Sequence, residues 1–357
     1  MYPRLVFDLD KIKQNLDVVA TEAKQAGCSV AVVTKSFCAD PRVTELIASH
    51  PLVDFLGDSR VQNLKSYEDL PKRKMLLRLP QAWEAAEAVR YADLSLNSEI
   101  ETLRLLNQAA GAQGKRHQVV LMIDLGDLRE GIFYEDEKAI RETAEEILRL
   151  PNLCFHGLGV NLTCYGAVIP KEDNLSILAD LAEMLRNAYD IELPMVSGGN
   201  SSSYHLIKKG QFPRGINNLR LGEAVILGNE TAYGERIPGT HGDGVVLEAQ
   251  IVEVKTKRSL PVGEIGVDAF GRKPVYQDRG MRKRAILAVG RQDVDVDGIT
   301  PMDSGAEILG ASSDHLILDV TDSREDYGVG DVMRFTLGYG GLLAATTSGY
   351  VGRVYVD

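Results

Sequence analysis

The sequence contains few cysteines, and they are not arranged in pairs. The four are Cys28, Cys38, Cys154 and Cys164, with no C-x-x-C motif and no ladder of histidines nearby. This spacing suggests neither a disulfide framework nor a zinc site. We therefore expect free thiols that pack as small apolar side chains, and no bound metal.

The chain also lacks an excess of positive charge and a long apolar run. Its formal net charge is -11 over 357 residues, whereas binding to a nucleic-acid backbone requires clustered Lys and Arg. No apolar run approaches the roughly 20 residues of a membrane span. The N-terminus, MYPRLVFD, lacks the charged region and apolar core of a signal peptide. We therefore expect a cytoplasmic protein that binds neither nucleic acid nor membranes.

What the sequence does contain is an alternation of short apolar segments with segments of helical periodicity. Ile12, Leu16, Val19 and Ala23 recur at helical spacing, and an apolar, β-branched run follows. From that run onward we predict eight strands, each followed by helical sequence, at residues 30–34, near 55, 75–79, 94–96, 119–124, 155–161, 195–197 and 219–221.

Continuous apolar strands of this length indicate burial on both faces, as in a parallel sheet. Eight such units predict a TIM (β/α)8 barrel, whose chemistry sits at the C-terminal strand ends. From about residue 240, short strands separated by Gly- and Asp-rich turns predict an antiparallel β domain, to which residues 5–8 add a strand. The predicted fold class is therefore α/β, with a barrel at residues 9–228 and a C-terminal β domain at 229–357 plus 1–8.

Polar residues at the predicted strand ends point to one site. The Gly-Gly-Asn-Ser-Ser-Ser run at residues 198–203 lies between a strand and a helix, where free N–H groups, hydroxyls and the helix dipole favour a phosphate. In this fold the loops after strands seven and eight are the usual phosphate site. Gly222, after strand eight, lets backbone approach the same anion. Taken alone, the run would favour a plain Gly-Ser loop over a phosphate site.

Lys35 follows the first predicted strand, and Arg220 lies in the last one. A lysine in a partly desolvated barrel mouth can have a lowered pKa and attack a carbonyl. Together with a phosphate cradle, this is the layout for pyridoxal 5'-phosphate (PLP) held as a Schiff base. Arg220 would then reach the ring nitrogen and keep it unprotonated. Without these neighbours, Lys35 would be a solvated strand end and Arg220 a rim salt bridge.

Five motifs occur in order along the chain: AVVTK at 31–35, MIDLGDLREG at 122–131, GLGVNLTCY at 157–165, SGGNS at 197–201 and LRLGEAVILG at 219–228. This ordered set resembles the alanine racemase-like, fold-type III PLP-dependent enzymes, most closely the alanine/ornithine racemase subgroup. The resemblance covers essentially the whole chain. It implies a PLP-binding barrel, an amino-acid substrate, and a head-to-tail homodimer in which the partner's β domain completes each active site.

The resemblance also implies roles for individual residues. Lys35 forms the Schiff base and acts as one acid/base at the substrate Cα, while Arg129 contacts a cofactor oxygen and the side of the substrate carboxylate. The other implied cofactor contacts are Asn161 beside the ring, Tyr339 near the phosphate, and Asn200, Ser201, Gly222 and Glu223 (through its backbone) around the phosphate.

The sequence departs from the family pattern at the second base. The usual tyrosine after a Pro-Gly-Glu turn is missing, and Asp268 falls at or near its place. Either Asp268 is the second base, or Tyr276 or His315 serves, or the reaction is not a two-base racemisation. Met122 replaces the lysine that many alanine racemases carbamylate, and Ala39 replaces another usual tyrosine.

Acidic residues near the implied substrate channel bear on specificity. Asp127, Asp268 and Asp314 could pair with the distal ammonium of ornithine or lysine and disfavour short apolar substrates, or they could be solvated loop acids. We therefore predict a PLP-dependent racemase of basic or broad amino acids. The alternatives are alanine racemase proper, or a PLP carrier or lyase of the same fold. A decarboxylase would place a glutamate at Arg220 and a cysteine in the β domain, and a metal-dependent lyase would place a His and Cys pair there.

Overall fold

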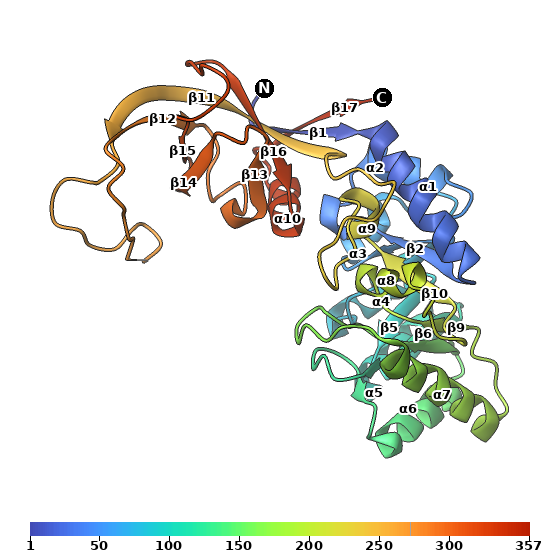
Figure 1. Ribbon diagram of the computed structural model, residues 1–357. Coiled ribbons are helices and arrows are strands. Elements are labelled where there is room, and N and C mark those ends of the chain that lie inside the picture. Colours follow the sequence, from blue (N-terminus) through green and yellow to red (C-terminus); the bar gives the residue numbers. More distant parts are fainter. Residues whose placement is uncertain (272) are drawn as a thin grey trace. The chain divides into compact units, whose positions relative to one another are not determined.

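The computed structural model describes residues 1–271 and 273–357. The chain divides into two compact units (Figure 1). We call Lys11–His241 the barrel unit, and Met1–Asp10 together with Gly242–Asp357 the β unit.

The barrel unit is built on a closed ring of eight parallel strands. The ring closes where β10 pairs with β2, with Arg220 opposite Ala31. A further strand, β7 (Ile132–Phe133), pairs with the end of β6. The ring confirms the predicted barrel. In order around it, the strands are β2 (Ser29–Val33), β3 (Phe55–Asp58), β4 (Arg73–Leu76), β5 (Leu94–Asn97), β6 (His117–Asp124), β8 (Leu153–Gly159), β9 (Met195–Ser197) and β10 (Asn218–Leu221).

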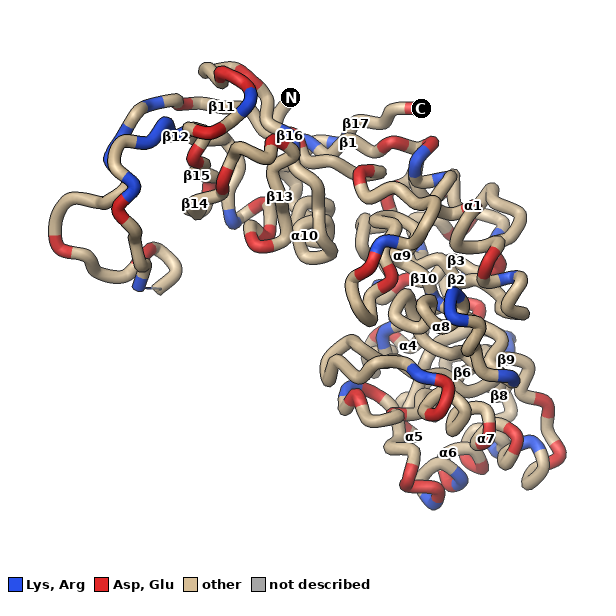
Figure 2. Tube along the Cα trace, in the orientation of Figure 1, with Lys and Arg blue, Asp and Glu red and all other residues tan. Residues whose placement is uncertain are grey.

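Helices connect the strands and carry the polar surface of this unit. Along α6, acidic and basic side chains pair at i,i+4 spacing, as in Glu137 with Arg141 and Glu145 with Arg149. Figure 2 shows charged positions of both signs along this helix. Exposed pairs of this kind stabilise a helix by about 0.3–0.5 kcal/mol each. The helices are α1 (Leu9–Gln25), α2 (Pro41–Ser49), α3 (Val61–Ser66), α4 (Ala85–Tyr91), α5 (Ile100–Ala112), α6 (Glu137–Arg149), α7 (Glu172–Tyr189), α8 (Tyr204–Lys208) and α9 (Glu223–Ile226).

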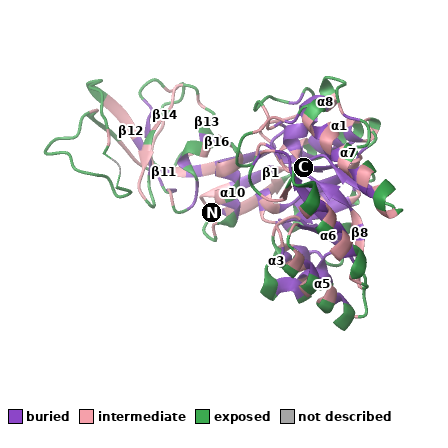
Figure 3. Cartoon of the chain, turned by 90° about the horizontal axis from the view of Figure 1, so that it is seen from below, coloured by how far each residue is buried: buried purple, intermediate pink, exposed green. Residues whose placement is uncertain are grey.

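Apolar side chains from alternate strand positions fill the barrel interior. The cluster includes Phe55, Met75, Val120 and Met122, all of them buried, and most exposed residues lie on the helices and loops outside (Figure 3). Met122, which stands where the resembled family has a lysine, is thus part of the apolar core. Close packing also dictates a glycine on β8, since a Cβ on Gly157 would lie 1.8 Å from a carbonyl oxygen of β9.

The β unit contains an eight-stranded sheet with the main order β13-β16-β11-β12-β15-β14. Strand β1 pairs antiparallel with β11 and parallel with β17, so the predicted strand at residues 5–8 is confirmed. The elements are β1 (Arg4–Asp8), β11 (Val245–Arg258), β12 (Met281–Leu287), β13 (Ile299–Pro301), β14 (Glu307–Ala311), β15 (Leu316–Asp319), β16 (Val332–Leu337), α10 (Tyr339–Thr347) and β17 (Gly352–Val356).

Some elements differ from the sequence prediction. The helical sequence that follows the predicted strand at 75–79 begins as a 3-10 turn, Ala82–Glu84. There the Glu84 carboxylate accepts the Gln81 N–H at 3.0 Å and Arg78 Nη2 at 2.8 Å. Helix α10 was not predicted, since its YGGLLAATT sequence has no amphipathic period. Within residues 1–271 and 273–357, no helix has the length and apolar character needed to cross a bilayer.

Candidate active site

Lys35 is held at the barrel rim by the residue before it. Thr34 Oγ1 donates to Asp58 Oδ2 at 2.6 Å and lies 3.1 Å from Tyr67 Oη. These contacts fix the end of β2 to the end of β3. Lys35 then opens a 3-10 turn, Lys35–Phe37, and its side chain is partly buried.

The environment of Lys35 disfavours its charged form. Burial lowers the pKa of its ammonium, and the positive charge of Arg129 acts in the same direction. Cys164, Asp58 and Glu130 act in the opposite direction without cancelling the effect. A larger share of neutral amine is therefore present than in a solvated lysine.

Arg129 stands in the loop after β6 beside a carboxylate. Its Nη2 donates to Glu130 Oε1 at 2.5 Å, and its Nε also contacts this carboxylate. The loop returns to the end of β6 through β7, which requires Gly131. That residue has φ of +117°, and a Cβ there would lie 2.7 Å from the Asp124 nitrogen.

Arg220 is buried inside the top of the barrel, with 2% of its surface exposed. Its Nη2 donates to Asn161 Oδ1 at 2.7 Å and to the Val160 carbonyl at 2.5 Å, while Nη1 contacts Ser197 Oγ. Burial lowers the pKa of Arg220 to about 10, and the charge of Glu130 opposes that decrease. The guanidinium therefore stays protonated at neutral pH.

Asn161 joins the two arginines through Glu130. Its Nδ2 donates to Glu130 Oε1, while its Oδ1 accepts from Arg220. Hydrogen bonds therefore connect Arg129, Glu130, Asn161 and Arg220 across the ends of β6, β8 and β10.

Of the three serines after β9, only Ser201 turns its hydroxyl toward the next strand end. Ser202 Oγ donates to the Leu162 carbonyl and Ser203 Oγ to the Gly198 carbonyl. Ser201 Oγ instead accepts the N–H groups of Gly222 at 3.4 Å and Ala224 at 3.2 Å. A hydroxyl and backbone N–H groups thus converge beyond β10, an arrangement that suits a phosphate.

Two other predicted phosphate contacts have additional structural roles. The Asn200 side chain caps the turn after β9, because its Oδ1 accepts the Ser202 N–H at 2.8 Å and its Nδ2 donates to the Leu162 carbonyl at 3.2 Å. Glu223 opens α9. Burial raises the pKa of its carboxyl to about 7, which weakens its repulsion of an anion at the same turn.

Asp127 lies at the same rim but faces backbone. Its carboxylate accepts four N–H groups between residues 163 and 168, at 2.9 to 3.2 Å. Its side chain is buried, and only 1% of the residue is exposed. This geometry favours holding that loop in place over the predicted contact with a substrate ammonium.

The remaining predicted residues belong to the β unit. Asp268 is exposed in the segment between β11 and β12, where its Oδ1 accepts the Phe270 N–H at 2.9 Å. Asp314 is exposed in the turn before β15 beside Ser313, and Tyr339 opens α10. The structure therefore brings together the predicted residues of the barrel unit, while these three lie in the other unit.

Sequence reasoning missed Glu130 and Ser197. Glu130 follows Arg129 directly, and Ser197 is the last residue of β9, so both were visible as polar residues at strand ends. Nothing in a single sequence distinguishes a carboxylate that contacts its neighbouring arginine from one that faces solvent.

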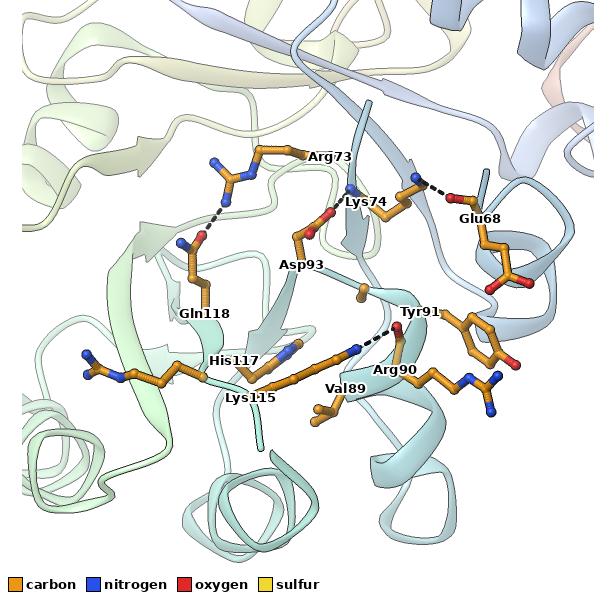
Figure 4. A pocket seen from close by; sticks show the side chains of 12 residues that line it. Glu68, Arg73, Lys74, Val89, Arg90, Tyr91, Asp93, Lys115, His117 and Gln118 are labelled. Carbon is orange, nitrogen blue, oxygen red and sulfur yellow. Dashed lines mark hydrogen bonds between the residues drawn. The ribbon is translucent and has the colours of Figure 1, made fainter. Parts of the chain in front are cut away.

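A cavity of about 550 Å³ lies at the opposite end of the barrel, where β4, β5 and β6 begin (Figure 4). It is lined by several basic side chains, and those of Lys74 and Lys115 are bound to backbone. Lys74 Nζ donates to the Glu68 and Leu70 carbonyls at 2.8 and 2.6 Å, and Lys115 Nζ to the Arg90 carbonyl at 3.4 Å. The Glu68 and Leu70 carbonyls lie just after α3, and the Arg90 carbonyl lies in the last turn of α4. Binding to carbonyls at helix C-terminal ends gives both lysines a structural role.

The chain is similar to known racemases in sequence and in fold. Ornithine racemase of Acetoanaerobium sticklandii is 53% identical over 353 residues, and lysine racemase of Thermotoga maritima is 39% identical over 357, each match covering 99% of both chains. Alanine racemase from Bartonella henselae, solved with covalently bound pyridoxal phosphate, shares the fold at a TM-score of 0.73 and 14% identity, covering 99% of both chains. Residues 7–230 match the family "Alanine racemase, N-terminal domain", and the chain belongs to that family.

Proposed function

We propose that the protein is a PLP-dependent racemase that interconverts the L and D forms of basic amino acids of the ornithine and lysine type. The structural observation that carries the proposal is the convergence of Lys35, Arg220 and Ser201 at one end of one barrel. The ornithine and lysine racemases among its relatives support both the reaction and the substrate class.

The donor set at the rim fits PLP. Ser201 with the N–H groups beyond β10 would hold the phosphate, and the buried, protonated Arg220 would face the ring nitrogen. Lys35, with its lowered pKa, would bind the aldehyde carbon. These are the three parts of the cofactor that a protein must contact.

The chain's own residues then act on protons and charge. When bound, PLP withdraws electrons from the substrate Cα and makes its proton acidic. Lys35 takes or returns that proton on one face, and burial helps because it favours the neutral amine. Arg129 holds the substrate carboxylate by charge.

Racemisation also needs a proton donor on the other face of Cα. We assign this role to Asp268, and the substrate entrance to Asp314, both from a second copy of the chain. Their exposure in the β unit is consistent with insertion into a partner, and so is the exposed apolar segment around Asp268, with Val267 69% and Phe270 46% exposed. The proposed assembly is a homodimer with active sites at the interface.

The first prediction tests the reaction and the substrate class. Purified protein with PLP in D2O is expected to exchange the Cα hydrogen of ornithine and lysine and to produce both enantiomers, with much less turnover of alanine. Lys35→Ala is expected to lower kcat by roughly 10²- to 10⁴-fold. Chiral chromatography and mass spectrometry measure both.

Each contrary result has a distinct meaning. Exchange with retained chirality would reject the two-base racemase in favour of single-base chemistry. Rapid turnover of alanine alone would support an alanine racemase. Cofactor binding at Lys35 without exchange of any amino acid would support a PLP carrier.

A further inference from the structure

Three cationic side chains gather at the barrel mouth, and one carboxylate joins two of them. The cations are Lys35, Arg129 and Arg220. The carboxylate is Glu130, whose side chain is 15% exposed, against 38% for Arg129. Glu130 contacts Arg129 through two nitrogens, the planar geometry in which a guanidinium and a carboxylate bind most strongly.

The second contact of Glu130 determines the orientation of Asn161. The carboxylate requires the Nδ2 donor of Asn161, and the Arg220 guanidinium requires its Oδ1 acceptor at 2.7 Å. A reversed amide would place donor against donor and acceptor against acceptor. Asn161 therefore has one orientation, and it transmits the position of Glu130 to Arg220.

The charge of Glu130 is stable at neutral pH. Burial by itself would raise the pKa of this carboxyl, but hydrogen bonds and charge from Arg129, together with Asn161 and Arg220, lower it below its ordinary value. Glu130 also raises the pKa of Lys35, whereas Arg129 lowers it. One carboxylate thus influences all three cations.

We propose that Glu130 is a positioning residue that fixes Arg129 and, through Asn161, Arg220 as one rigid frame for the cofactor ring, while offsetting positive charge at Lys35. This inference rests on the proposed PLP site and adds a residue to it. This role needs both the negative charge and the length of a glutamate, because the carboxylate binds Arg129 and Asn161 at once.

The experiment compares Glu130→Gln and Glu130→Asp with Glu135→Gln, a matched loss of charge at an exposed position five residues along the chain. Each protein is stripped of cofactor and titrated with PLP, and the absorbance of the Lys35-linked cofactor is followed as a function of pH. Thermal unfolding and circular dichroism check the fold of each variant.

Glu130→Gln is expected to bind PLP about tenfold or more weakly, since a charge-assisted contact is lost. Its absorbance midpoint should move to lower pH, because an anion near Lys35 has gone while Arg129, Asp58 and Cys164 still face the amine. Glu130→Asp should keep the midpoint but bind PLP more weakly, because it is one methylene shorter. Glu135→Gln should match the unchanged protein.

Equal PLP affinity and equal midpoints for Glu130→Gln and Glu135→Gln would overturn the inference. If Glu130→Gln does not fold, unchanged affinity in Glu130→Asp would overturn it instead. An unchanged protein that binds no PLP, or binds it equally after Lys35→Ala, would reject the proposed function and this inference together. Rejection of Glu130 alone leaves the proposed function standing.

Discussion

In the protein without its cofactor, the partly buried Lys35 lowers the free energy of unfolding at neutral pH. Burial disfavours the ammonium of Lys35, so its pKa is lower in the folded chain than in the unfolded one. The unfolded chain therefore binds more protons between these two pKa values, and the free energy of unfolding rises with pH through that window. At neutral pH the chain keeps a destabilised residue at the position where the proposed chemistry needs an amine.

Replacement of Lys35 by an apolar residue should remove this loss of stability. Lys35→Met, freed of PLP, is expected to have a higher free energy of unfolding than the unchanged apoprotein at neutral pH. The difference should be full below the folded pKa of Lys35 and should vanish as pH rises to the ordinary pKa of lysine. Urea unfolding over a pH series measures it.

Lys138→Met provides the control, since the Lys138 side chain is 85% exposed on α6. It should produce no such pH-dependent gain. A Lys35→Met protein that is less stable than the unchanged one at neutral pH would contradict the argument.

Single residues of the site were predictable to different degrees. Lys35 and Arg220 could be predicted because the ends of apolar strands meet at one barrel rim. The role of Asp127 could not, because a carboxylate that accepts four backbone N–H groups and one that meets a ligand look alike in sequence. Glu130 was hidden for a similar reason, as its partner Asn161 lies on another strand end.

At the scale of elements, the loop between β8 and α7 depends on Asp127. Thr163 and Ala167 both have positive φ, at 64° and 55°, which costs free energy for residues other than glycine. Gly166 cannot carry a side chain, because a Cβ would lie 2.6 Å from the Asp127 carbonyl oxygen. The carboxylate therefore holds a strained loop that also carries Cys164, a neighbour of Lys35.

Asp127→Asn should release this loop. The asparagine amide has one acceptor oxygen, whereas the four backbone N–H groups now donate to two carboxylate oxygens. At least some of these four hydrogen bonds are therefore lost. We expect the free energy of unfolding to fall by about 2–4 kcal/mol, measured by urea unfolding. Hydrogen exchange at Thr163, Tyr165 and Val168 should accelerate.

Asp180→Asn, at an exposed position of α7, should leave both measurements unchanged. A variant with normal stability but a raised KM for ornithine relative to alanine would favour the substrate contact that the sequence suggested for Asp127.

Elements were predictable where one local signal dominated. Most barrel strands contain a buried apolar stretch because both faces of the sheet are covered, and that pattern is visible in the sequence. Strands β13, β14 and β17 were not predicted, because they are short and only partly buried. Their position depends on pairing with strands that are distant in the sequence, and such pairing leaves no local pattern in a single sequence.

At the scale of the whole molecule, the proposed active site divides between two copies of the chain. Lys35 belongs to the barrel unit and Asp268 to the β unit. If the site forms between copies, a variant that lacks Lys35 and a variant that lacks Asp268 are each inactive alone. A dimer of one with the other contains one site in which both residues are intact.

Lys35→Ala and Asp268→Asn, each nearly inactive, are therefore expected to regain racemase activity when they are mixed and allowed to exchange subunits. Random exchange would restore about a quarter of the unchanged activity, because half of the dimers are mixed and each has one intact site. Activity assays before and after exchange measure this, with analytical ultracentrifugation to establish the dimer. No recovery after verified exchange would place both residues in one chain's site, and full activity of Asp268→Asn by itself would remove Asp268 from the reaction.

The pairing of β1 with both β11 and β17 has a consequence for how the chain is made. During synthesis the whole barrel unit emerges between β1 and its first partner β11, and β17 emerges after the other strands of the β unit. The barrel can therefore close while β1 is still unpaired, and the sheet of the β unit cannot be completed until β17 has emerged from the ribosome. Because β1 and β17 are neighbours, a linker joining residue 357 to residue 1, with new ends opened in a barrel loop, would reverse that order of assembly.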